Sequence, residues 1–185
     1  MSLSGPEWVP QFPTRTGVDD LADPFRANVQ NFLAALNAAG ATVIIADTLR
    51  PPERLSLMHY CFQVANSVIE PAQVPAIPNV DIQWVHDDGQ GNPDLQASTA
   101  AAAQMVEAYG IVFAPAVNSL HGLGQAIDMH ISWSGDLTLA NADGSTAVLT
   151  TAPQDGQNPD LHKVGATYGV IKLLSDPPHW SSTGH

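Results

Sequence analysis

The sequence predicts an α+β fold in which a small antiparallel sheet is flanked by helices. Segments with helical periodicity are separated by short β-branched runs. A hairpin signal at Asp143-Gly144 joins two alternating segments, so neighbouring strands should run antiparallel. The segments also lack the strict strand-helix alternation of parallel α/β proteins, which favours the α+β class.

The chain begins with residues 1–22, an expected extended lead-in that contains three prolines and shows no clear periodicity. Asp23-Pro24 is a typical helix start, with a capping carboxylate before a proline at the first helical position. Apolar residues then recur at helical spacing up to Gly40. At 185 residues in total, we expect one folded domain over residues 23–185, beginning with this helix.

The middle of the chain is predicted to form strands and helices in alternation. Four elements are expected there: a strand at 42–46, a helix at 52–68, a short strand at 80–86 and a helix at 98–110. Arg50 would stand at the corner between the first strand and the first helix, and Ser98 would cap the last helix.

The clearest strand lies at 125–133, where apolar and polar residues alternate. One predicted face holds Gln125, Ile127, Met129, Ile131 and Trp133, and the opposite face holds Ala126, Asp128, His130 and Ser132. This is the pattern of a half-buried strand whose polar face presents Asp128 and His130. The remaining elements are hairpin strands at 137–139 and 147–149, a helix at 158–169 and a last strand at 169–174.

The charge of the chain argues against several classes of partner. The net charge is −12, and the six lysines and arginines are scattered, so no basic stripe exists to neutralise phosphates. We therefore expect no nucleic-acid partner. No apolar run is long enough for a bilayer, and neither a heptad repeat nor a long apolar edge requires a dimer, so we expect a monomer without a membrane partner. The single cysteine, Cys61, excludes an internal disulfide.

Two short segments contain residue types that ligate metals. His121 precedes Asp128 by seven positions, and two glycines between them allow a tight turn and a close approach. His179 follows two prolines, whose fixed φ angles hold that segment rigid. A lone histidine is usually a hydrogen-bonded turn or core residue, but a catalytic zinc takes three His, Asp or Glu ligands and keeps a fourth position open. His121, Asp128 and His179 would supply such a set.

In this combination the sequence resembles the zinc D-Ala-D-Ala metallopeptidases, which include VanX- and VanY-type peptidases and phage L-alanoyl-D-glutamate endopeptidases. The family pattern Ser-x-His-x-x-Gly-x-Ala-x-Asp is matched at every fixed position by Ser119-Leu-His121-Gly-Leu-Gly124-Gln-Ala126-Ile-Asp128. A second signature, with a catalytic acid three residues before a histidine, is similar to Asp176-Pro-Pro-His179-Trp180. The family's substrate-contacting arginine lies in a segment that looks like Ala46-Asp-Thr-Leu-Arg50-Pro-Pro-Glu-Arg54.

The resemblance implies the Hedgehog/DD-peptidase fold and one Zn²⁺ ion held by His121, Asp128 and His179. It also implies that Asp176 is the general base toward the attacking water and that Arg50 stabilises the oxyanion. Asp176 departs from the glutamate of many members but resembles the phage endopeptidase branch.

Four further residues are candidates for substrate binding: Ser119, Trp84, His86 and His130. Each also has a structural explanation. Ser119 could cap a turn, Trp84 and His86 at a strand end could belong to the core, and His130 could be a core histidine. His130 could also lie beside the ligands or replace one of them.

The predicted activity is hydrolysis of peptidoglycan stem or cross-link peptides that contain D-amino acids. Two alternatives remain open: a D-Ala-D-Ala carboxypeptidase or dipeptidase that acts on small peptides, and a non-catalytic zinc-containing binding domain like those of Hedgehog type. No signal peptide is visible, so we expect synthesis in the cytoplasm and action on the cell wall or periplasm after release or delivery. A phage lysin, a delivered toxin and a domain excised from a larger protein all fit.

Overall fold

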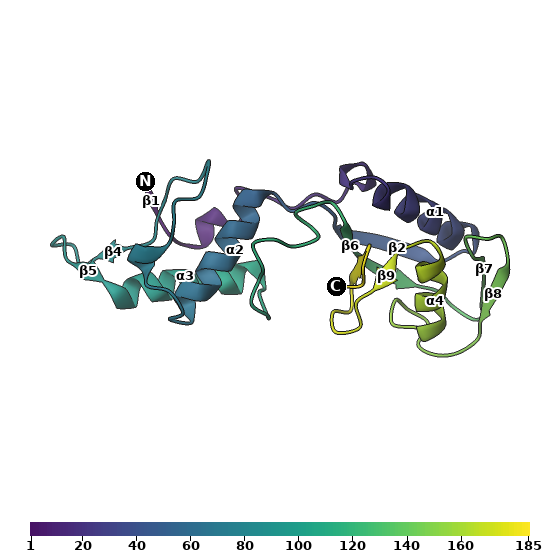
Figure 1. Ribbon diagram of the computed structural model, residues 1–185. Coiled ribbons are helices and arrows are strands. Elements are labelled where there is room, and N and C mark those ends of the chain that lie inside the picture. The colour runs from purple at the N-terminus through teal and green to yellow at the C-terminus, as the bar shows by residue number, and fades with distance from the viewer. The chain divides into compact units, whose positions relative to one another are not determined.

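The computed structural model describes all residues from 1 to 185 and contains four α-helices and short, mostly antiparallel strands, which confirms the α+β class (Figure 1). The chain divides into two compact units. Unit 1 comprises residues 1–13 and 51–119, and unit 2 comprises residues 14–50 and 120–185. Because two compact units can belong to one folding domain, the single domain expected over 23–185 stays a prediction. None of the helices is long and apolar enough to cross a membrane.

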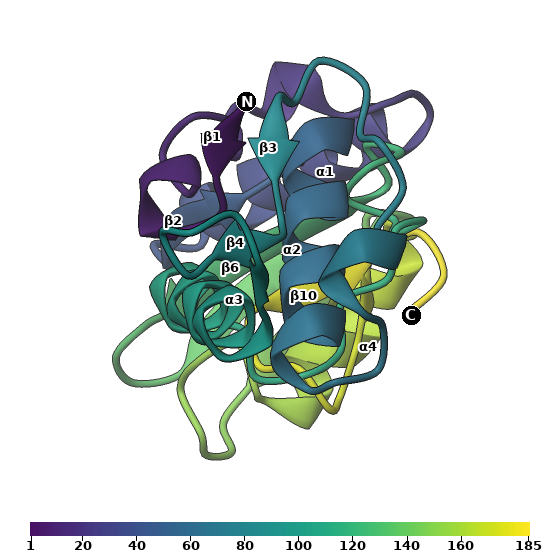
Figure 2. The same cartoon turned by 90° about the vertical axis from the view of Figure 1, so that its left-hand side faces the viewer.

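Unit 1 is built on two packed helices, α2 (Pro52–Ala65) and α3 (Leu95–Tyr109). Its short strands are β1 (Ser2–Leu3), β3 (Ile82–Gln83), β4 (His86–Asp87) and β5 (Pro93–Asp94). β1 pairs in parallel with β3 (Figure 2), and β4 pairs antiparallel with β5. The strand expected at 80–86 is therefore divided into two shorter ones.

The core of unit 1 also draws on the first residues of the chain. Its buried members are Trp8, Leu57, Cys61, Val64, Ile77, Ile82, Trp84, Ala102 and Met105. Trp8 follows β1 in a short 3₁₀ helix, Pro6–Trp8, and its indole N–H donates to the Leu3 carbonyl at 2.9 Å. Residues 1–13 are therefore packed into unit 1, where a purely extended surface segment was expected.

The start of α3 differs from the expectation. The helix begins at Leu95, and the carboxylate of Asp94 caps it by accepting from the Ala97 amide at 2.8 Å. Ser98, the expected cap, lies one turn inside the helix, where its hydroxyl donates to the Asp94 carbonyl at 2.7 Å. Since both residue types are good caps, only the point at which the chain becomes helical decides between them.

Unit 2 is organised around a four-stranded antiparallel sheet in the order β2, β6, β10, β9. These strands are β2 (Thr42–Asp47), β6 (Ala126–Ser132), β9 (Ile171–Lys172) and β10 (His179–Ser181). The predicted hairpin is present as β7 (Leu137–Ala140) paired with β8 (Thr146–Leu149). The helices are α1 (Phe25–Ala38) and α4 (Pro159–Thr167).

The two helices of unit 2 begin in different ways. Asn158 caps α4, as its position before a proline predicts, and its side-chain oxygen accepts from the amides of Asp160 and Leu161. No side chain caps α1, because the carboxylate of Asp23 pairs with Arg26 instead. The expected capping role of Asp23 is therefore wrong.

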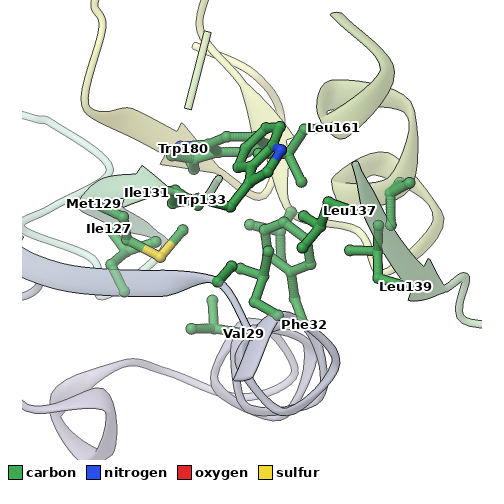
Figure 3. Close-up of a cluster of buried hydrophobic side chains, with 14 of the residues drawn as sticks. Val29, Phe32, Ile127, Met129, Ile131, Trp133, Leu137, Leu139, Leu161 and Trp180 are labelled. Carbon is green, nitrogen blue, oxygen red and sulfur yellow. The ribbon is translucent and has the colours of Figure 1, made fainter. Parts of the chain in front are cut away.

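One face of the sheet carries the core of unit 2, which Figure 3 shows between the sheet and the helices. Its members include Val29, Phe32 and Leu36 of α1, Ile127, Met129 and Ile131 of β6, Leu161 and Val164 of α4, and Trp180 of β10. The rings of Phe32 and Trp180 lie 5.6 Å apart, centroid to centroid. Because side chains alternate along a strand, Asp128 and His179 lie on the opposite face of the sheet. The alternation predicted for this strand is thus confirmed.

We predict that Gly165→Ala destabilises unit 2 by about 1–3 kcal/mol, the usual effect of overpacking a core. A Cβ at Gly165 would lie 2.8 Å from Cζ3 of the fully buried Trp180 and 2.8 Å from the Val170 carbonyl oxygen. Neither group is the free end of a flexible side chain. Urea unfolding of the metal-free protein measures the effect, with Ala166→Ser at the next, exposed position as the control. Equal stability of the two variants would contradict this packing.

Candidate metal centre

Strand pairing brings two of the predicted ligands together. In the ladder between β6 and β10, Asp128 is the direct partner of His179. Residues that are directly opposite in an antiparallel pair project from the same face of the sheet, with Cβ atoms about 4.5–5.5 Å apart. The face that they share is the one turned away from the core.

The third ligand comes from the turn that precedes β6. The His121 carbonyl accepts there from the amides of Arg50 and Gly124, each at 3.3 Å. The turn around it is closed by Gln125 N, which donates to Leu120 O at 2.8 Å. Gly124 adopts a φ of +65°, and a Cβ there would lie 2.8 Å from the amide nitrogen of Ala22. The close approach that the sequence indicated at these glycines is therefore an approach of the main chain at Gly124 to Ala22.

Three ligand atoms converge at this place. His121 Nε2 lies 3.2 Å from Asp128 Oδ1 and 3.1 Å from His179 Nδ1, and the last two atoms are 3.1 Å apart. The side chains are buried, with 2% of His121 and 8% each of Asp128 and His179 exposed. Such a cluster could hold a metal ion.

The hydrogen-bond partners of the two imidazoles decide which nitrogen faces the cluster with a lone pair. His121 Nδ1 lies 2.9 Å from the Thr48 carbonyl oxygen, and His179 Nε2 lies 3.2 Å from the main-chain oxygen of His185. Since these oxygens can only accept, we assign the imidazole protons to these two nitrogens. The neutral rings then turn two lone pairs toward a carboxylate oxygen, and only a cation or an extra proton can bring three acceptors so close.

Asp128 is oriented by the residues around it. Burial by itself would raise the pKa of Asp128, but its contacts with the side chains of His121 and His179, together with the positive charge of Arg50, hold that pKa well below its usual range. Arg50 Nη2 donates to Asp128 Oδ2 at 3.1 Å. Because the guanidinium occupies this oxygen, the other oxygen, Oδ1, is the one that faces the imidazoles.

Residues 47–50 support the cluster from the end of β2. The buried carboxylate of Asp47 accepts hydrogen bonds from Arg50 Nε and from the hydroxyl of Thr14. Arg50 is therefore held by two carboxylates, while its Nη1 nitrogen takes part in no hydrogen bond. The role of Arg50 toward an oxyanion stays a prediction. Sequence reasoning missed Asp47, although its spacing of three residues before Arg50 was a usable signal.

Asp176 lies in the loop between β9 and β10 and is half-buried. Its main chain is ordered by hydrogen bonds, since Asp176 N donates to Leu173 O at 3.3 Å and His179 N donates to Asp176 O at 3.1 Å. Its carboxylate forms neither a hydrogen bond nor an ion pair. The acid is therefore available to an incoming group, and its role as a base stays a prediction.

A buried cation that the sequence did not single out lies nearby. Lys172 on β9 is 6% exposed. Burial lowers the pKa of Lys172, while the negative charges of Asp176 and Asp128 partly offset this effect. A single charge inside the apolar run of residues 170–174 was the signal that could have identified it.

The other predicted site residues lie elsewhere. His130 is exposed on the same face of β6 as Asp128 and lies outside the cluster, beside a cavity of about 170 Å³ that reaches Pro177. Trp84 is buried in the core of unit 1, which favours a packing role, and His86 Nε2 is 2.9 Å from the Ser4 hydroxyl. Ser119 is half-buried and is the last residue of unit 1. Substrate binding by these residues stays a prediction.

Comparisons with known proteins do not add to this description of the cluster. No family model matches the chain, and no curated protein matches it. Its functional interpretation therefore depends on its own residues and their geometry.

We predict that the protein binds one metal ion per chain and that His121→Ala, Asp128→Ala and His179→Ala each abolish this binding. Elemental analysis of dialysed protein measures the stoichiometry. His130→Ala is the matched control, because this histidine lies on the same strand face but outside the cluster. Loss of the metal in His130→Ala, or its retention in His121→Ala, would show that the ligands are assigned incorrectly.

We predict that the metal-free protein loses stability in acid through Asp128. The pKa of this carboxyl is lower in the folded state than its ordinary value of 3.8, so the unfolded chain binds more protons and stability falls as the pH drops below about 4. Asp128→Asn has nearly the same shape and cannot ionise. Urea unfolding between about pH 7 and about pH 3 should therefore show a smaller loss of stability in Asp128→Asn. An equal loss in both proteins would contradict the prediction.

Proposed function

We propose that this chain is a zinc metallopeptidase with a Hedgehog/DD-peptidase-like fold that hydrolyses peptidoglycan peptides containing D-amino acids. The observation that carries the proposal is the convergence of His121, Asp128 and His179 on one point. An unpaired acid, Asp176, precedes the last of these ligands by three residues. The same residues form the two motifs that resemble the family.

The donor set of two imidazoles and one carboxylate favours zinc. Magnesium and calcium prefer oxygen ligands, whereas zinc is bound by histidine nitrogen and aspartate oxygen at about 2.0–2.2 Å. In a tetrahedron with such bonds, ligand atoms are about 3.3–3.6 Å apart. The three observed separations of 3.1–3.2 Å come within a few tenths of an ångström of that spacing.

The number of ligands favours catalysis over a purely structural role. Structural zinc sites are closed by four protein ligands, whereas catalytic sites use three and keep one position for water or substrate. The cluster contains three ligand residues. This count supports an enzyme over the alternative of a non-catalytic binding domain.

The chemistry then divides between the ion and the chain. Bound zinc would supply a Lewis acid that lowers the pKa of water and polarises a carbonyl group. Asp176, whose carboxylate forms neither a hydrogen bond nor an ion pair, would take the proton of the attacking water and pass it to the leaving amine as the C–N bond breaks. Arg50 would donate from Nη1 to the carbonyl oxygen as negative charge develops on it. Its bonds to Asp47 and Asp128 hold it in a fixed orientation for this role.

The substrate class is inferred from the resemblance. Ser119, His121, Gly124, Ala126 and Asp128 reproduce the family pattern, and Gly124 is needed here for a left-handed turn against residue 22. Gly124 therefore has a structural reason of its own, and a match at all five fixed positions is more specific than a match at one of them. Wall peptides with D-amino acids are the substrates that this resemblance implies.

We predict that the zinc-loaded protein releases new peptide fragments from purified peptidoglycan and that a chelated sample releases none. Asp176→Asn should retain zinc but lose about 100- to 10,000-fold in rate, the usual contribution of a general base. Mass spectrometry of the digest measures the fragments, and their new termini identify the bond. Asp160→Asn changes a half-buried acid of α4 that pairs with Lys163 and lies outside the cluster, and this variant should cleave like the unchanged protein.

The outcomes separate the alternatives. Cleavage of D-Ala-D-Ala or other short peptides, without fragments from intact wall, would replace the proposal by a carboxypeptidase or dipeptidase. Tight zinc binding without hydrolysis of either substrate would favour the non-catalytic domain. Full activity of Asp176→Asn would reject Asp176 as the base.

A further inference from the structure

Lys172 occupies an unusual environment for a lysine. It lies on β9, where its direct partner on β10 is Trp180, and its Nζ is 5.8 Å from the centroid of that ring. Only 6% of the residue is exposed. A buried ammonium group is costly unless its N–H groups find acceptors, so the partners of Lys172 indicate what it does.

All three donors of the ammonium are directed at main-chain oxygens of one short segment. Nζ donates to the carbonyls of Leu173 and Asp176, and to the His179 carbonyl at 3.1 Å. A lysine ammonium has three N–H donors and no acceptor, so this set uses it completely. The bonds reach the first residue, an inner residue and the last residue of the segment 173–179.

This segment needs such a donor because of its own sequence. Pro177 and Pro178 have no N–H groups and cannot contribute donors to a turn. The carbonyls of these prolines have other donors, since Gln157 Nε2 donates to Pro177 O at 2.6 Å and Met129 N donates to Pro178 O at 2.8 Å. Lys172 supplies donors to the carbonyls of Leu173 and Asp176, and it shares the His179 carbonyl with the amide of Leu173.

We propose that Lys172 is a positioning residue whose ammonium fixes the segment 173–179, so that the imidazole of His179 meets His121 and Asp128. It binds the main chain of the ligand itself, His179, and does not contact the metal-binding atoms. Its bond to the Asp176 carbonyl fixes the main chain that presents the proposed base, and this second role rests on the proposed function. The first role does not, because it concerns metal binding alone.

The test is a comparison of zinc affinity in Lys172→Met and Lys163→Met, measured by competition with a chromophoric chelator. Methionine keeps an unbranched apolar side chain only one atom shorter than that of lysine, but it has no N–H donor. We expect Lys172→Met to bind zinc about 10- to 100-fold more weakly, the usual cost of losing a group that orients a ligand. Lys163 is the matched control, because its side chain is 77% exposed and pairs only with Asp160 at the surface. Its variant should bind zinc like the unchanged protein.

A spectrum separates positioning from general stability. Cobalt bound in place of zinc reports the ligand geometry through its visible absorption, and urea unfolding of the metal-free variants reports stability. We expect a changed cobalt spectrum in Lys172→Met, and Lys172→Arg should recover part of the zinc affinity because it restores donors in a different, planar arrangement. Unchanged zinc affinity and cobalt spectrum in Lys172→Met would overturn the proposal.

A second variant covers the case in which Lys172→Met does not fold. Lys172→Gln keeps N–H donors on a shorter, neutral side chain, and its zinc affinity should fall between those of the unchanged protein and the control with His179→Ala. Zinc affinity equal to that of the unchanged protein would overturn the proposal here too. These titrations need no substrate, so they remain decisive even if the protein hydrolyses no wall peptide, and failure of the two proposals can be told apart.

Discussion

The register between β6 and β10 is the constraint on which the rest of unit 2 depends. It pairs Asp128 with His179 on one face of the sheet and Ile127 with Trp180 on the other. The first pair belongs to the metal-binding cluster, and the second belongs to the core beneath α1 and α4. Because side chains alternate along a strand, a slip by one residue would exchange the two faces. The burial of Trp180 therefore fixes the position of the ligand beside it.

The cluster is also held by groups that do not contact a metal. The Thr48 carbonyl orients His121, the Arg50 guanidinium occupies one oxygen of Asp128, and the Lys172 ammonium binds the main chain of His179. Each ligand thus has its own partner, which lies either on the strand β9 or just after the end of the strand β2. Partners of this kind fix the orientation and basicity of ligands, so a site of three residues depends on at least six. Two of the six basic residues of this acidic chain are used in this way.

The contacts that define the cluster lie within unit 2. Thr14, Asp47, Arg50, His121, Asp128, Lys172, Asp176 and His179 all belong to residues 14–50 or 120–185. Unit 1 has its own core, which contains Trp84, a residue that the sequence suggested for substrate binding. Its aromatic ring is therefore explained by packing within unit 1. The metal-binding geometry can be understood without reference to that unit.

The sequence by itself determined the α+β class, the alternating faces of β6, the hairpin and the three residues of the cluster, because these depend on local periodicity or on rare residue types in a fixed spacing. It placed the caps of α1 and α3 incorrectly, since neighbouring residues such as Asp94 and Ser98 compete for the same role within one turn. Only the tertiary structure decided that Arg50 binds Asp128 and that Lys172 binds the loop before His179. A lysine or arginine has many acceptors within reach, and its choice among them is made by strand pairing between segments far apart in the chain.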